Sequence, residues 1–487
     1  MLSRLSALSL CAALALSISA CDPCPSCKSK PRPTPTATPT ASATPTASAT
    51  PTQSATPTPT PTPPPQAFIT TDSSLLAVDP GKGLAYVALA GLDTNGNGQV
   101  AVINVNADPD VTDPRIVTID LGHPDFAGGV AIDPTSGTVM VTSGGNGNGG
   151  FLDLITESTN TLIPGSPFAF PAGADSGIKG GTSGQVLFDP LTNHAVVSTV
   201  DDASTCPVPG QCTGFAEFDL SSKTFSPVLQ APLADEFAFN ATLNQIIAPS
   251  DDIDPPFEIP GSIIAVDVAN SRGCQLFDAN MSALDYDPDG VGIDPVTNIV
   301  VLGNFSSTEA TVINLQGSSF SPAVSTATPT PACMLNEGGT PPNSVNIDTG
   351  TGASMPGVAV NPVNHEAFLT AIDAAPIALM GLPAASATQL DPGSVTSLAH
   401  ATVPNDPGGN SFAAAAFPYG TVIDVDNNFG YVIDVAGAFL AQIDLTAFKT
   451  NPSAISTALP SGNCKGTATA FSCKNGNGVV FFPLPSG

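Results

Sequence analysis

The sequence predicts an all-β protein whose folded part is a seven-bladed β-propeller, and three observations support this. A fourteen-residue pattern of two short apolar runs around a turn occurs seven times, with copies beginning at Leu76, Val130, Val186, Phe237, Val291, Val358 and Thr421. Successive copies are 54, 56, 51, 54, 67 and 63 residues apart, in or just above the range of propeller blades. The repeat region shows no amphipathic helical period. Seven such units of about four strands each close naturally into one ring.

Each copy predicts a tight β-hairpin, because two of its columns hold residues suited to one kind of turn. The turn opens on Asp or Asn, whose side chain can accept hydrogen bonds from turn amides. Four residues later stands a residue that tolerates positive φ, as a type I turn closed by a bulge requires. The opening column is Asp79, Asp133, Asp189, Asn240, Asp294, Asn361 and Asp424. The later column is Gly83, Gly137, Asn193, Asn244, Asn298, His365 and Asn428.

A second pair of strands follows each hairpin and completes the blade. Examples are Gln99–Val105 with Arg115–Ile119, and Gly214–Leu220 with Phe225–Leu229. These runs are apolar on both faces because a blade packs between two neighbours. The late apolar segment Gly478–Pro483 supplies a strand that helps to close the ring, or else covers an edge. We therefore expect residues 67–487 to form one seven-bladed domain, since single blades cannot bury their faces alone.

The chain begins with a secretory signal peptide at residues 1–20, in which Arg4 precedes an apolar run and small residues. The residues Ile18-Ser19-Ala20-Cys21 resemble the lipobox of bacterial lipoproteins. This resemblance implies cleavage before Cys21 and acylation of its thiol, which would anchor the chain to a membrane. Ordinary signal cleavage after Ala20 is the alternative. The expected location is a bacterial cell envelope, at the periplasm or the cell surface.

Residues 21–66 form the predicted linker, which is almost wholly Pro, Thr, Ala and Ser from Lys28 to Gln66. Such a composition cannot bury a core, and its prolines favour an extended, disordered stalk. Cys24 and Cys27 have the spacing of a redox or metal pair. Without a βαβ context a redox site is not expected there, and a local disulfide is the simpler interpretation.

The folded part is strongly acidic, with eight Lys and Arg against forty Asp and Glu in residues 67–487. This balance excludes nucleic acid as a partner, because the phosphate backbone would be repelled. It favours either a cation-binding surface or simple solubility of a sparsely charged protein. The remaining partners are a protein or a small-molecule ligand of unknown identity.

Six cysteines in the folded part point to disulfides, since an exported protein folds in an oxidising compartment. The most local pairing joins Cys206 to Cys212, Cys464 to Cys473, and Cys274 to Cys333, among fifteen possible pairings.

Two acidic loops are candidate calcium sites, because alternating oxygen-bearing residues that end in Gly open an EF-hand-type loop. The first candidate has Asp285, Asp287 and Asp289, and the second has Asp93, Asn95 and Asn97. Both lack the acidic residue at loop position twelve, where Val296 and Asn104 stand. Ordinary turn chemistry is the alternative explanation.

No catalytic residue is assigned from the sequence. It has no Gly-x-Ser-x-Gly elbow, no His-Glu-x-x-His pair and no phosphate loop. His123, on an expected inter-blade loop, is the best candidate for acid–base chemistry, whereas His194 and His365 belong to the hairpin turns.

The repeats resemble the YVTN or lactonase-like family of bacterial propellers, through runs such as "GVAIDPTSGTVMVTS" and "QVAVINV". The resemblance covers roughly residues 75–460 and implies the blade structure. Some relatives are sugar lactonases that use His, Arg and acidic residues around the channel. The prediction favours an envelope-anchored binding, interaction or structural module over an enzyme. The alternative is a lactonase-like hydrolase assisted by a divalent cation such as calcium.

Overall fold

The chain divides into residues 1–64 and residues 65–487, and the residues that the computed structural model describes all belong to the second part. They are residues 75–89, 91–107, 112–144, 149–175, 184–201, 206, 212–231, 236–240, 243, 245–250, 262–267, 272–276, 288–305, 307–315, 319–320, 334–335, 343–371, 374–384, 390, 392–407, 410–414, 420–434, 438–456, 464–467, 470–474 and 478–485. The predicted signal peptide, Cys21 and the Pro/Thr-rich linker lie outside them.

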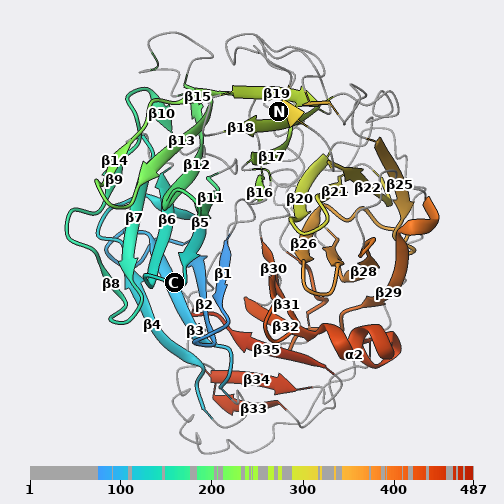
Figure 1. Cartoon of the computed structure of the whole chain (residues 1–487). Coiled ribbons are helices and arrows are strands. Elements are labelled where there is room, and N and C mark those ends of the chain that lie inside the picture. Colours follow the sequence, from blue (N-terminus) through green and yellow to red (C-terminus); the bar gives the residue numbers. More distant parts are fainter. Residues whose placement is uncertain are drawn as a thin grey trace, which may run out of the picture. The chain divides into compact units, whose positions relative to one another are not determined.

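The prediction of seven blades built from antiparallel strands is confirmed (Figure 1). Blade 1 comprises β1 (Leu76–Asp79), β2 (Leu84–Leu89), β3 (Gln99–Asn104) and β4 (Arg115–Asp120). Blade 2 comprises β5 (Phe126–Asp133), β6 (Thr138–Gly144) and β7 (Phe151–Thr156), with β8 (Thr161–Leu162) and β9 (Phe168–Ala169) both paired to β7. Blade 3 comprises β11 (Val186–Asp189), β12 (His194–Asp201) and β13 (Gly214–Asp219), with β14 (Thr224–Phe225) and β15 (Leu229–Gln230) on β13 and β10 (Ala174–Asp175) on β12. Blade 4 comprises β16 (Ala238–Asn240), β17 (Gln245–Ser250), β18 (Ser262–Asp267) and β19 (Arg272–Leu276).

The last three blades follow the same plan and carry the additional elements. Blade 5 comprises β20 (Pro288–Asp294), β21 (Ile299–Asn304), β22 (Glu309–Asn314) and β25 (Asn343–Asp348), with a separate pair β23 (Ser319–Phe320) and β24 (Met334–Leu335). Blade 6 comprises β26 (Gly357–Asn361), β27 (Glu366–Thr370), β28 (Pro376–Gly381) and β29 (Thr396–Thr402), with the 3₁₀ turn η4 (Pro392–Ser394). Blade 7 comprises β30 (Thr421–Asp424), β31 (Phe429–Asp434), β32 (Phe439–Asp444), β35 (Val479–Pro483), β34 (Ala470–Lys474) and β33 (Cys464–Thr467), with the short helices α2 (Leu445–Thr450) and α3 (Pro452–Ile455).

The hydrophobic core lies between the blades. One buried cluster joins Ile299 and Val301 of blade 5 to Ala367 and Leu369 of blade 6. The second strands are buried on both faces, as in β21, because each contacts a neighbouring blade on either side. Within the described residues, no helix has the length and apolar character that a membrane span requires.

The ring closes through packing between the first and last blades. Contacts between inner strands run from β1 to β5, β11, β16, β20, β26 and β30, and from β30 back to β1. Tyr431 and Phe482 of blade 7 belong to the same buried cluster as Leu76 of blade 1. The late strand β35 pairs with β32 inside blade 7, so this segment completes its own blade and then carries the β33–β34 hairpin.

The hairpin turns have the predicted conformation. The positive-φ column has φ of 65° at Gly83, 67° at Gly137, 60° at Asn193, 58° at Asn298, 53° at His365 and 57° at Asn428, while Asn244 lies outside the described residues. The side chains of the residues that open the turns accept hydrogen bonds from turn amides, as expected. In blade 2, for example, Oδ1 of Asp133 accepts a hydrogen bond of 2.9 Å from the Thr135 amide.

The same two columns also connect adjacent blades, which the sequence analysis did not anticipate. Asn240 Nδ2 donates to Asn298 Oδ1 of the next blade at 3.1 Å, and Asn361 Nδ2 donates to Asn428 Oδ1 at 2.9 Å. Between blades 5 and 6, His365 Nδ1 lies 2.6 Å from Asp294 Oδ2. At these three junctions the positive-φ residue of one blade therefore contacts the turn-opening residue of the blade before it.

We call the side of the ring with these hairpin turns the turn face. The loops between blades, and those between second and third strands, emerge on the opposite side, which we call the loop face. Each inner strand runs from the loop face to the turn face, so its first residues lie at the loop end of the ring's central channel.

Candidate binding site

The central channel of the ring is the main candidate for a binding site. It encloses about 550 Å³ and is lined by residues from the inner strands of all seven blades. Its polar lining side chains, among the described residues, are Thr135, Gln185, Glu236 and Thr421, and the others are aliphatic, aromatic, Pro or Gly. A mostly apolar pocket of a few hundred Å³ with a small number of polar groups is the usual form of a small-molecule site.

Gln185 and Glu236 occupy equivalent places at the loop end of the channel. Gln185 directly precedes the third repeat, which begins at Val186, and Glu236 directly precedes the fourth, which begins at Phe237. Gln185 Oε1 accepts a hydrogen bond from the Phe237 amide of the next blade. In the same way, Glu236 Oε2 accepts one from the Val291 amide at 3.0 Å. Both side chains are buried, and each connects its blade to the following one.

The pKa of the Glu236 carboxyl is raised well above its ordinary value. Burial is the main cause, because it disfavours the charged form. The amide of Val291 lowers the pKa without offsetting burial, and the negative charge of Asp289 raises it further. Burial thus shifts the equilibrium of the Glu236 carboxyl toward its neutral form, and a positive charge nearby would shift it back.

Glu236 was not among the predicted site residues, although the sequence holds a signal for it. The residue before the repeat is Gly in four of the seven copies, at Gly129, Gly290, Gly357 and Gly420, and Leu75 in another. Gln185 and Glu236 are the polar exceptions in this column. A polar residue just before an inner strand is a candidate for lining the channel.

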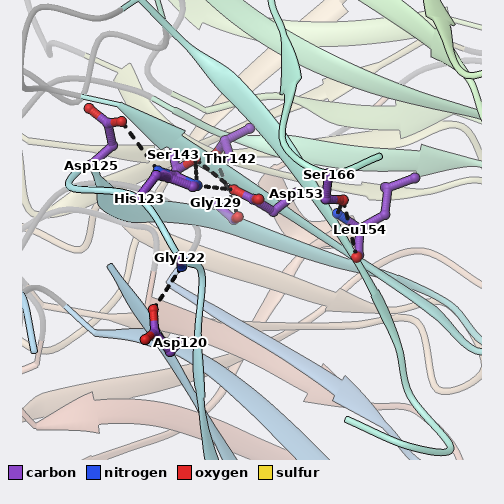
Figure 2. Close-up of polar contacts among 10 residues, drawn as sticks. All are labelled: Asp120, Gly122, His123, Asp125, Gly129, Thr142, Ser143, Asp153, Leu154 and Ser166. Atoms are coloured by element: carbon purple, nitrogen blue, oxygen red, sulfur yellow. Dashed lines mark hydrogen bonds and ion pairs between the residues drawn. The ribbon is translucent and has the colours of Figure 1, made fainter. Parts of the chain in front are cut away.

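A second polar cluster surrounds His123 on the loop face of blade 2, as Figure 2 shows. His123 precedes β5 on the inter-blade loop, as predicted, and its Nδ1 lies 3.2 Å from Asp125 Oδ2. Its Nε2 lies 3.0 Å from Oδ2 of Asp153 on β7. Ser143, at the end of β6, donates to the same Asp153 oxygen at 2.7 Å.

This arrangement holds the imidazole between two carboxylates. Burial would lower the pKa of His123, but the hydrogen bond and charge of Asp153, together with Asp125, outweigh burial and raise it. Ser143 is fully buried and directs its hydroxyl to Asp153, 3.5 Å from His123 Nε2. His123 is not one of the residues that line the channel. The cluster therefore fits a charged link between the loop and blade 2 more closely than an activated serine.

The two calcium predictions remain predictions. Asp285 and Asp287 lie outside the described residues, whereas Asp289 lies in β20 and is buried. Asp93 Oδ1 accepts the amides of Asn95 and Asn97 at 2.7 and 2.8 Å, the turn chemistry that the sequence also allowed. No group of three or more His, Cys, Asp and Glu side chains is placed to hold a metal ion in the part of the chain that the structure describes.

The cysteine predictions are answered in part. Cys206 and Cys212 form the predicted disulfide. The backbones of Cys464 and Cys473 lie directly opposite each other in the β33–β34 hairpin. Cys333, and with it the pairing of Cys274, falls outside the described residues.

The two histidines assigned to the hairpin turns have carboxylate neighbours. His365 contacts Asp294 as described above, and His194 Nδ1 lies 3.3 Å from Glu217 Oε1. Neither residue lines the channel.

Comparison with known proteins supports the fold. No family model and no curated protein matches the chain. Among solved structures, a hydrazine synthase chain of Kuenenia stuttgartiensis matches with 8% identity and a TM-score of 0.50, covering 80% of this chain and 97% of that one. A chain of a mitotic checkpoint complex matches with 12% identity and a TM-score of 0.47 over 80% of this chain and 94% of that one. Hsv2 of Kluyvelomyces marxianus matches with 9% identity and a TM-score of 0.44 over 78% and 93%. At 8% identity, the likeness to the hydrazine synthase chain concerns the fold alone.

Proposed function

We propose that the protein is a lipid-anchored binding module of a bacterial cell envelope and that its ligand site is the central channel. The observation that carries the proposal is the channel of about 550 Å³ with apolar walls and a buried carboxyl, Glu236, at its loop end. Burial of a ligand's apolar surface supplies affinity, and a small number of polar groups orients the ligand.

Binding is tested with a neutral apolar fluorescent probe, N-phenyl-1-naphthylamine, added to the mature chain. We expect its fluorescence to rise on binding and the rise to be abolished by Ala359→Phe, which fills the channel from β26. Ala238→Leu fills it from β16 and serves as a second variant if the first fails to fold. The control Ser222→Phe places the same ring on an exposed turn of blade 3. Equal probe binding by all these variants would contradict the proposal.

The anchor is tested separately with Cys21→Ser in the full-length precursor. We expect the wild type to incorporate labelled palmitate and to sediment with membranes, because the lipobox-like residues end at Cys21. The variant is expected to lose both properties. Sedimentation of unlabelled wild type would show another mode of attachment.

A lactonase-like hydrolase is the second candidate, and the His123 cluster is the observation that favours it. A histidine between two carboxylates is a possible general base, although both ring nitrogens are already engaged. The test is hydrolysis of a panel of lactones by wild type and by His123→Gln. Turnover that His123→Gln lowers at least about a hundredfold would support this function, in line with the usual contribution of a general base. No turnover, or turnover that the substitution leaves unchanged, would count against it.

A further inference from the structure

The channel is chemically asymmetric around its axis. Blades 3 and 4 supply the aromatic lining residues Phe188, Phe237 and Phe239, together with Gln185 and Glu236. The remaining blades supply aliphatic residues, such as Val130, Ile293, Val360 and Val422, apart from the two threonines. One side of the channel is therefore acidic and aromatic, and the other side is aliphatic.

From this asymmetry we propose that the channel binds a cationic amphiphile, with its ammonium-type head at Glu236 and its apolar body along the inner strands. The inference rests on the proposed binding function and specifies the class of ligand.

The acidic groups at the loop end of the channel indicate that the head group of the ligand is cationic. Glu236 is the ionisable side chain among the channel's described lining residues, and Asp289 is close enough to act on it electrostatically. An anionic head would meet two acidic groups in a site where charges are weakly screened. A cationic head is attracted to both groups and stabilises the ionised form of Glu236.

The apolar walls of the channel indicate that the body of the ligand is apolar. A cavity of about 550 Å³ lies within the range of pockets that hold drug-sized molecules. Its aliphatic side offers contact area but no hydrogen-bonding side chain between the two ends, because Thr421 lies at the loop end and Thr135 at the turn end. An alkyl or other apolar body can fill this space.

A metal ion fits the channel poorly. Calcium binds six to eight oxygens and magnesium demands octahedral geometry. The described lining offers one carboxylate, and one of its oxygens already accepts the Val291 amide at 3.0 Å. An organic cation needs no such complete set of ligands.

The test compares three probes of equal length on the mature chain: octylamine, 1-octanol and octanoate. Each is titrated against bound N-phenyl-1-naphthylamine. We expect octylamine to displace the dye at a concentration at least about tenfold lower than octanol, because a desolvated charge pair adds at least that factor. Octanoate is expected to be the weakest of the three.

Variants then assign the preference to the carboxyl. Glu236→Gln keeps an oxygen for the Val291 amide and is expected to bind octylamine and octanol about equally, within about threefold. The matched control is Glu217→Gln, because Glu217 also has a raised pKa but does not line the channel. This control is expected to keep the preference for the amine.

A second measurement detects whether the Glu236 carboxyl releases its proton when the ligand binds. Below the raised pKa of Glu236, binding of an ammonium group should expel the carboxyl proton, so calorimetry in buffers of different ionisation enthalpy should record its release. The titratable neighbour is Asp289, which stays present in the Glu236→Gln variant. That variant is expected to release fewer protons than the wild type.

The outcomes separate the two proposals. If the dye binds but all three probes displace it equally, or octanoate is strongest, the ligand class is wrong and the binding function stands. If the amine preference survives Glu236→Gln, the assigned head-group site is wrong. If the dye does not bind to the wild type, the binding function and this inference both fail.

Discussion

The two ends of the inner strands both bury carboxylates, but they do so in different ways. At the turn face, Asp294 accepts the Val296 and Thr297 amides at 2.9 and 3.3 Å and contacts His365 Nδ1 at 2.6 Å. At the loop end, Glu236 accepts the Val291 amide and has Asp289 as a charged neighbour. A buried acid is thus no marker of function by itself. Several local donors indicate a structural acid, whereas a single donor beside an apolar cavity indicates a group that can receive a ligand.

The largest expected effect comes from removing a turn-face acid. Asp294→Ala leaves two turn amides and His365 without their acceptor, so we expect the free energy of unfolding to fall by about 3 kcal/mol or more. Denaturant unfolding measures the loss. The control is Asp219→Ala, whose carboxylate caps a more exposed turn at 2.7 Å from the Ser221 amide, where water can replace it. Equal losses in the two variants would remove the distinction between buried and exposed turns.

His123 provides an intermediate case, since its cluster lies on the loop face but has several partners. The raised pKa means that the protonated ring stabilises the fold, fully below the ordinary value of 6.5 and progressively less as pH rises through the raised pKa. His123→Gln should therefore cost about 2 kcal/mol near pH 5.5 and less near pH 9. Thermal unfolding across this range tests the slope. A cost independent of pH would mean that the ring is held neutral.

Substitution of Glu236 should raise the stability of the ligand-free protein, whereas substitution of the structural acid Asp294 should lower it. The raised pKa of Glu236 penalises the ionised folded state, so stability is greatest below the ordinary pKa of 4.5 and falls as pH rises through the raised value. We expect Glu236→Gln to stabilise the ligand-free protein at pH 8, by about 1.4 kcal/mol for each unit by which the pKa is raised. The gain should vanish near pH 4. A loss of stability at pH 8 would place Glu236 with the structural acids.

The smallest expected effect is at the tip of the same turn that Asp294 opens. Val296 is 66% exposed, two residues from a fully buried acid. Val296→Ser should change the free energy of unfolding by no more than about 0.5 kcal/mol. A larger loss, measured by the same denaturant unfolding, would indicate that the exposed tips of the turn face are covered in solution.

The sequence was sufficient for the blades, because each hairpin repeats a local requirement. An opening Asp or Asn and a residue with positive φ act within the turn itself, so seven copies predict seven hairpins without knowledge of their neighbours. The side-chain bond from Asn361 to Asn428 was not predictable in this way. It joins residues 67 positions apart, and the same residue types already had a local explanation.

The candidate site was less accessible to sequence reasoning. His123 was identified as a loop residue, but its partner Asp153 lies 30 positions away on β7. Glu236 has no motif around it, and its importance arises from burial and from the convergence of seven strands on one cavity. These are properties of the assembled ring. The calcium loops show the reverse case, because an alternating acidic pattern is also produced by ordinary turns such as that of Asp93.

The blades are independent of one another in their chain connectivity. Every blade in the described part of the chain is built from one continuous segment, and blades 7 and 1 meet by packing rather than by a shared sheet. The junction between them is thus of the same kind as the six others, and no blade is obliged to be first. A circularly permuted gene that begins at another inter-blade loop would encode the same ring.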